Sequence, residues 1–254
     1  MIYSELINKV IKFAYDAHHG QIDKAGVPYF CHPFHVAEQM NTEEEVIVAL
    51  LHDVLEDTDK TETEILSVGV TEKQLEAIKL LTRKDGVSYF EYVENLKLNP
   101  IAKRVKMADL AHNSDLSRTV NPTERDFKRI EKYKKAKEIL PTWEMKLIPE
   151  AFNKIVSGEK KIELRLNDEK RRAIFVGDKI VFTNTTDENK KLVAEVVALH
   201  RFESFESIFR TELFSLCGFG NLVVEKAIEK MRNFYTESDE YKYGIVGIEL
   251  LITN

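Results

Sequence analysis

Residues 46–58 read VIVALLHDVLEDT, an apolar run that ends abruptly in acidic residues and contains no lysine or arginine. On a helix, Glu56 lies one turn from both His52 and Asp53, because residues three and four apart share a face. Asp57 lies one turn from Asp53 in the same way. Unpaired charge is costly to bury, so this stretch predicts a buried helix with a cation bound beside its acidic end.

The rest of the first half also has helical periodicity. Its apolar residues recur at three- and four-residue spacing, and prolines interrupt the pattern where helices are expected to stop. The lysine-rich segment 128–137 is expected to be a solvated helix face. The amphipathic stretches cover residues 2–17, 43–56, 71–81, 89–96, 101–116 and 123–139. We therefore predict an all-α domain over residues 1–139.

Alternation of apolar and polar residues replaces the helical spacing after Pro141, and such alternation predicts β-strands. It occurs at residues 143–147, 162–166, 180–182, 192–199 and 244–252. Helical patterns at 149–157 and 222–234 lie between these strands. We predict a small α+β domain with a curved or barrel-like sheet over residues 142–254, after a boundary near Leu140.

The composition narrows the classes of function. The 254 residues include 43 acidic and 37 basic side chains, for a net charge of −6, which argues against dedicated duplex DNA binding. Two cysteines are too few for a disulfide framework or a cysteine-based zinc module. Charge interrupts the apolar residues at the N-terminus, unlike a secretory signal, and no stretch approaches the roughly 20 apolar residues of a membrane span. We expect a cytoplasmic protein without a membrane partner.

Residues of the kinds that bind metals also occur in two other segments of the predicted helical domain. These segments are His32 and residues 107–113, MADLAHN. In the second segment Asp109 and Asn113 repeat the one-turn spacing. Imidazole and carboxylate ligands together suit Mn, Fe, Zn or Ni better than calcium. The pattern therefore favours a transition-metal site.

Three ordered motifs resemble the hydrolase domain of the Rel/Spo alarmone enzymes, a branch of the HD phosphohydrolase superfamily. They are GQIDKAGVPYFCHP at residues 20–33, ALLHDVLEDT at 49–58 and VKMADLAHN at 105–113. The small stand-alone alarmone hydrolases are the most similar. The resemblance covers residues 1–139 and implies an HD-type helical fold. It also implies removal of the 3′-pyrophosphate from ppGpp or pppGpp, which releases GDP or GTP and pyrophosphate.

The same resemblance implies roles for individual residues. Glu56 and Asp57 match the acidic pair that positions or deprotonates the attacking water, and Asn113 matches a nucleotide contact. The implied ligands of one Mn²⁺-type ion are His32, His52, Asp53 and Asp109. The basic candidates for holding phosphate are Lys24, Arg83, Lys84, Lys106 and Arg118.

Two departures from the family pattern leave the substrate open. Asp23 occupies the place of a basic residue that stacks on guanine, and Asp115 lies where better-known members are basic. One alternative is a phosphohydrolase of another nucleotide, such as an NADPH phosphatase. Another, from a different class, is an RNA-binding regulator whose helical domain senses an alarmone without turnover.

In the second half, Gly158, Lys160, Glu163 and Arg165 spell G-x-K-x-x-E-x-R, which resembles the motif of ASCH domains. The resemblance covers residues 142–254 and implies a PUA-like barrel that binds RNA or a nucleotide in a cleft at Lys160, Glu163 and Arg165. We expect Lys170 and Arg171 to add phosphate contacts there.

The charged residues of this segment also permit an interpretation without a binding cleft. Side chains alternate between the two faces of a strand, so Lys160 is expected on the face opposite Glu163 and Arg165. Charge on both faces is typical of an exposed edge strand that is protected from pairing with other chains.

Overall fold

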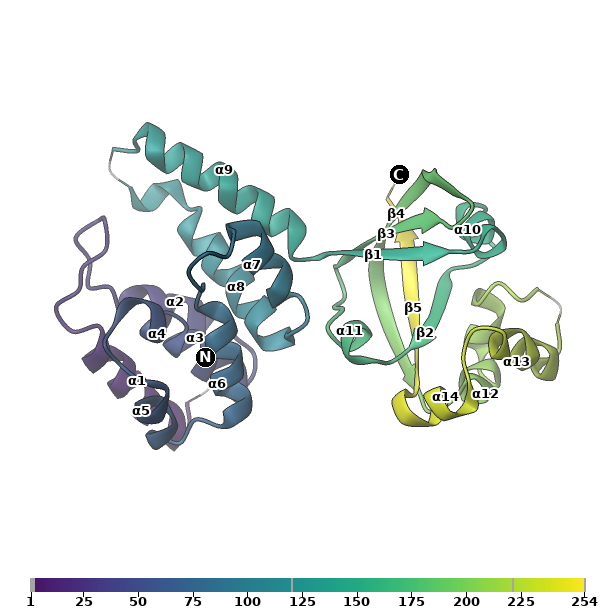
Figure 1. Ribbon diagram of the computed structural model, residues 1–254, viewed down its shortest axis with the longest axis horizontal. Helices are drawn as coiled ribbons and strands as arrows, with labels where there is room; N and C mark the ends of the chain where they lie inside the picture. The colour runs from purple at the N-terminus through teal and green to yellow at the C-terminus, as the bar shows by residue number, and fades with distance from the viewer. Residues whose placement is uncertain (1–2, 120, 221, 254) are drawn as a thin grey trace. The chain divides into compact units, whose positions relative to one another are not determined.

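The computed structural model describes residues 3–119, 121–220 and 222–253. The chain divides into two compact units, Met1–Leu140 (unit 1) and Pro141–Asn254 (unit 2). Unit 1 is helical, whereas unit 2 contains one sheet with helices around it (Figure 1). The predicted order of an all-α half followed by an α+β half is confirmed. No helix among the described residues is long and apolar enough to cross a membrane.

The helices of unit 1 surround a central helix, α3, which is fully buried beyond its first turn. Residues 46–51 of α3 are inaccessible to solvent, and α3 packs against α1, α2, α6 and α8. Its buried C-terminal end therefore places the following residues deep inside the unit. The helices are α1 (Glu5–Ala17), α2 (Cys31–Glu38), α3 (Glu43–Leu51), α4 (Val54–Asp57), α5 (Glu62–Ser67), α6 (Glu72–Leu81), α7 (Tyr89–Leu96), α8 (Pro100–Asn113), the 3-10 helix Leu116–Arg118 and α9 (Glu124–Ile139).

The continuous helix predicted over residues 43–56 is wrong, because it breaks between Leu51 and Val54. The His52 imidazole makes a 2.7 Å hydrogen bond to the Ala49 carbonyl through Nδ1. In an uninterrupted helix that carbonyl accepts from the N–H of residue 53. The histidine side chain thus competes with the backbone ladder, and the chain turns at His52 and Asp53.

Unit 2 contains a five-stranded mixed sheet in the order β1-β3-β4-β5-β2. Strands β1 and β3 are parallel, and the other neighbouring pairs are antiparallel. The strands are β1 (Thr142–Leu147), β2 (Ile162–Leu166), β3 (Lys179–Asn184), β4 (Asp187–Phe202) and β5 (Ile245–Ile252). The helices are α10 (Pro149–Val156), α11 (Glu169–Arg172), α12 (Phe205–Phe209), the 3-10 helix Glu212–Leu216, α13 (Val224–Arg232) and α14 (Glu237–Tyr243).

The two edge strands of this sheet, β1 and β2, come close enough for a side chain to join them. Arg165 of β2 donates from Nη2 to the Lys146 carbonyl of β1 over 2.9 Å. Separate apolar clusters fill the unit, one around Phe182 and Trp143 and one around Phe205 and Phe209. The sheet is therefore curved, as predicted, and the space between its edges is available for a site.

Candidate functional site

Four side chains from three separate segments of unit 1 converge on one point. His32 comes from α2, His52 and Asp53 from the break after α3, and Asp109 from α8. One ligand atom from each of His32, His52 and Asp109 lies within 4.8 Å of the others. Asp53 Oδ2 lies 3.1 Å from His52 Nε2 and 3.5 Å from His32 Nε2. The four residues thus present two imidazole nitrogens and two carboxylates to a common centre.

Hydrogen bonds outside this cluster orient both imidazoles. His52 uses Nδ1 on the Ala49 carbonyl, while His52 Nε2 is buried and has no hydrogen-bond partner among the described residues. His32 Nδ1 lies 2.6 Å from His112 Nδ1, so His32 also turns Nε2 toward the carboxylates. Metal-binding histidines are held in this way, with one nitrogen on an outer partner and the other facing the ion. The two Nε2 atoms, both facing carboxylates at short distance, fit a cation at this centre.

Charge compensation inside the cluster is strong. Burial alone would lower the pKa of His52, but the neighbouring Asp53 outweighs burial and raises this pKa to about 9. Burial would raise the pKa of Asp53, yet His52 lowers it to about 2. Burial likewise opposes ionisation of Asp109, but Lys106 and the two histidines hold its pKa well below the usual range. Both carboxylates are therefore available in the ionised form that metal binding requires.

A cavity of about 210 Å³ opens beside this cluster. Its lining combines carboxylates, cations and tyrosines, which suits a polyanionic ligand close to a metal. The carboxylates are Asp53, Glu56, Asp57 and Asp109, the cations are Arg83, Lys106 and Lys132, the tyrosines are Tyr29, Tyr89, Tyr92 and Tyr133, and Leu81 and Asn113 complete the lining.

The acidic pair at the end of α4 is tied to its surroundings by identifiable contacts. The Tyr29 hydroxyl lies 2.8 Å from Asp53 Oδ2 and 3.0 Å from Asp57 Oδ2. Gln21 donates from Nε2 to the Asp57 carbonyl over 2.7 Å, and the backbone N–H of Arg83 donates to Glu56 Oε2 over 3.1 Å. The first and second sequence motifs are therefore joined physically at the cavity.

The basic and amide residues expected to contact substrate divide into two groups. Lys106 and Asn113 line the cavity, and each also contacts Asp109. Lys24 instead lies 3.4 Å from Asp126, and Arg118 pairs with Asp23 over 2.9 Å. Lys24 and Arg118 are not among the residues that line the cavity.

Sequence reasoning missed Leu81, the four tyrosines and Lys132 among the residues that line the cavity. Tyr29 lies within a motif that was noted, but its position between two carboxylates depends on the fold. Lys132 lies in the segment expected to be a solvated face, yet its Nζ is 4.3 Å from the ring centroid of Tyr89 and it lines the cavity. Nothing in the sequence distinguishes Lys132 from the other lysines of this segment.

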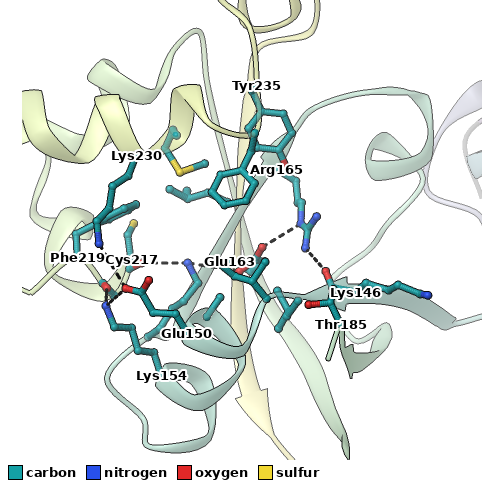
Figure 2. A pocket seen from close by; sticks show the side chains of 18 residues that line it. Lys146, Glu150, Lys154, Glu163, Arg165, Thr185, Cys217, Phe219, Lys230 and Tyr235 are labelled. Atoms are coloured by element: carbon teal, nitrogen blue, oxygen red, sulfur yellow. Dashed lines mark hydrogen bonds and ion pairs between the residues drawn. The ribbon is translucent and has the colours of Figure 1, made fainter. Parts of the chain in front are cut away.

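Unit 2 has its own cavity, of about 190 Å³, between the edge strands β1 and β2 and helices α10 and α13. Figure 2 shows Glu163 and Arg165 next to each other in its wall, with Tyr235 beside Arg165. Lys160 Nζ lies 3.4 Å from Glu163 Oε2, and Arg165 Nε lies 3.0 Å from Glu163 Oε1. The structure thus brings the three predicted cleft residues together.

The prediction that Lys160 lies within the strand, on the face opposite Glu163 and Arg165, is wrong. Strand β2 begins only at Ile162, and Lys160 instead forms an isolated bridge with Cys217. Lys160 is 8% exposed and Glu163 6% exposed, so these charges do not protect an exposed edge either. Gly218, with φ of +78°, makes room for the lysine stem, since a Cβ there would lie 2.7 Å from Lys160 Cβ.

Residues 145–253 match the ASCH domain family. This half of the chain is an ASCH domain. The ASCH domain is also similar to a solved structure, the crystal structure of hypothetical protein PH0355, at 39% sequence identity. That match covers 44% of this chain and 98% of the other, with a TM-score of 0.40.

Unit 1 is homologous to (p)ppGpp 3′-pyrophosphohydrolases. The guanosine-3′,5′-bis(diphosphate) 3′-pyrophosphohydrolase of Haemophilus influenzae is 34% identical over 131 residues, covering 44% of this chain and 19% of that protein. The protein of the same name from Spiroplasma citri is 27% identical over 244 residues, covering 80% of this chain and 32% of that protein. The chain thus spans a fifth to a third of the length of these relatives.

Lys170 and Arg171, which we expected to add phosphate contacts in the ASCH cleft, do not line the cavity. Both residues lie in α11, which contributes no residue to the cavity lining. Arg171 pairs with the helix-capping residue Asp168 over 2.6 Å. Lys146, Lys154 and Lys230 occupy the cavity wall instead.

Proposed function

We propose that unit 1 is a metal-dependent hydrolase that removes the 3′-pyrophosphate of guanosine alarmones. The observation that carries the proposal is the buried His32, His52, Asp53 and Asp109 cluster, which opens onto a cavity lined by both acids and cations. The homology of unit 1 supports the choice of alarmone. The overall reaction converts ppGpp and water to GDP and pyrophosphate.

In this proposal the four clustered residues hold one divalent ion, and their mixed nitrogen and oxygen donors suit Mn²⁺. A bound ion of this kind lowers the pKa of water and neutralises charge on phosphoryl oxygens. Glu56 and Asp57, one turn beyond the ligands, orient the attacking water and accept its proton. Arg83, Lys106 and Lys132 balance the charge of the pyrophosphate.

The direct test is hydrolysis of ppGpp by the full chain with added Mn²⁺, with NADPH assayed alongside and the products separated by chromatography. Release of GDP and pyrophosphate is the expected result. Turnover of NADPH alone would replace the proposed substrate and retain the metal chemistry. Tight ppGpp binding without turnover would favour the alternative of a non-catalytic alarmone sensor.

His112 is proposed as a positioning residue for the metal, because its Nδ1 is the partner of His32 Nδ1. We expect His112→Ala to weaken Mn²⁺ binding about 10-fold to 100-fold, which is typical when an outer hydrogen-bond partner of a metal ligand is lost. Isothermal titration calorimetry on the full chain measures this affinity.

His35→Ala is the matched control for His112→Ala. The His35 ring lies 4.3 Å from that of His112, centroid to centroid, but His35 has no described hydrogen bond to His32. We expect unchanged Mn²⁺ affinity in this variant. Equal affinities for both variants and the unmodified chain would contradict a positioning role for His112.

We further propose that the ASCH domain binds RNA or a nucleotide in its cavity. Among the residues that the structure describes, five basic and two acidic side chains line this cavity, although the whole chain has a net charge of −6. Such a local excess of cations attracts phosphates.

We expect Lys160→Ala and Arg165→Ala each to weaken binding of single-stranded RNA or nucleoside monophosphates by about 10-fold, since each removes a charged hydrogen-bond donor. Binding should be measured at fixed salt, because phosphate contacts depend on ionic strength. Undiminished affinity in both variants would place any nucleotide site outside this cavity.

A further inference from the structure

The polar wall of the ASCH cavity has an ordered donor and acceptor pattern. Lys160 offers only donors, Glu163 offers only acceptors, and Arg165 again offers only donors. Contacts of 3.4 Å and 3.0 Å join the three side chains through Glu163. The wall therefore presents donor, acceptor and donor in a row, with the carboxylate in the middle.

Glu163 is buried in the middle of this row, and each of its oxygens faces a cation. Oε1 lies 3.0 Å from Arg165 Nε, and Oε2 lies 3.4 Å from the Lys160 ammonium, which also donates to the Cys217 carbonyl over 3.0 Å. Oε2 has an ion pair but no well-aligned hydrogen bond among the described residues. A buried acceptor is stabilised by a well-aligned donor, so this carboxylate suits a ligand that carries an N–H group.

The size and the remaining walls of the cavity restrict the ligand further. Its volume of about 190 Å³ is below the roughly 300–1,000 Å³ of sites that enclose drug-sized molecules, which suits one small ring. Phe219, Phe234 and Tyr235 supply aromatic surface for stacking. Lys154 and Lys230 are partly exposed at 24% and 48%, and both lie near Glu150. These two lysines are therefore suited to bind a phosphate of the ligand that lies outside the cavity.

We propose that the ASCH cavity binds a uracil-class base by its imide edge. This inference rests on the proposed nucleotide binding by the ASCH domain and names the base. The edge consists of carbonyl, N–H and carbonyl, so it complements the row of donor, acceptor and donor. The ring N–H donates to Glu163, and the two carbonyls accept from Lys160 and Arg165. Cytosine has an acceptor nitrogen at the centre of this edge, opposite the carboxylate.

The test compares ligands that differ at the central hydrogen bond. Calorimetry on the full chain uses uridine monophosphate, cytidine monophosphate and the uridine nucleotide methylated at N3. We expect methylation to weaken binding about 10-fold to 100-fold, the range for losing a hydrogen bond to a charged group. Short oligouridylate and oligocytidylate at the same salt distinguish a base in RNA from a free nucleotide, and tighter binding of oligouridylate supports an RNA ligand.

Protein variants provide an independent readout. Glu163→Gln preserves the shape of the side chain and is expected to reduce the preference for uridine over its methylated form to below threefold. Glu206→Gln alters an exposed glutamate outside the cavity and should retain the full preference. Equal binding of all three nucleotides by the unmodified chain would overturn the uracil assignment while nucleotide binding stands. Failure of every nucleotide and RNA to bind would overturn both proposals.

Discussion

Asp53→Ala is expected to lower ppGpp hydrolysis about 100-fold to 1,000-fold, the loss seen when one charge-stabilising group is removed from an active site. Asp53 lies close to both clustered imidazoles, so its loss removes a proposed metal ligand and half of the carboxylate charge at the centre. Product chromatography measures turnover, and Mn²⁺ titration of the same variant should show weakened binding.

Asp59→Asn is the control for this change. Asp59 is an exposed acid close to Asp53 in sequence, and it does not line the cavity. We expect its turnover to remain within twofold of the unmodified chain. If Asp53→Ala retained full turnover with an unchanged circular dichroism spectrum, that result would contradict the proposed metal centre.

Phe182→Ala is expected to have the largest effect on stability, a loss of about 3–5 kcal/mol in the free energy of unfolding of unit 2. Phe182 lies on β3, is fully buried and is one of the largest side chains in its apolar cluster. Truncation removes the contacts of the ring and leaves a cavity that packed neighbours fill only in part.

Tryptophan fluorescence during urea unfolding measures this loss for unit 2 alone, because Trp143 is the only tryptophan of the chain and is 3% exposed in that unit. Tyr241→Ala is a matched aromatic control, since Tyr241 is 94% exposed. We expect it to change stability by less than about 0.5 kcal/mol, as surface substitutions usually do. Similar midpoints for both variants would contradict the described packing.

The fold class of both halves followed from hydrophobic periodicity. Helix α7 and strand β1 follow their predicted ranges closely, because their burial patterns have the simple periods of helix and strand. The break after α3 was beyond this reasoning. It depends on a histidine side chain bonding to its own helix, and the apolar period of the sequence continues through that point.

The candidate sites were predictable only in part for a related reason. Motif spacing named residues that the structure brings together, such as His32 and Asp109. It did not find Lys132, whose position against the Tyr89 ring depends on the packing of α9 near α7. It also misplaced Lys160. This residue forms a bridge with Cys217, which is distant in sequence, and strand β2 begins only at Ile162.

The ion pair between Asp23 and Arg118 has a consequence for how such chains diverge. Asp23 also accepts hydrogen bonds from the backbone N–H groups of Ala25 and Val27, so it both shapes its own loop and receives a guanidinium from a segment 95 residues away. A basic residue at position 23 would repel Arg118 and leave those N–H groups without an acceptor. The two positions are therefore expected to be inherited as a matched pair, in which a change at one favours a compensating change at the other.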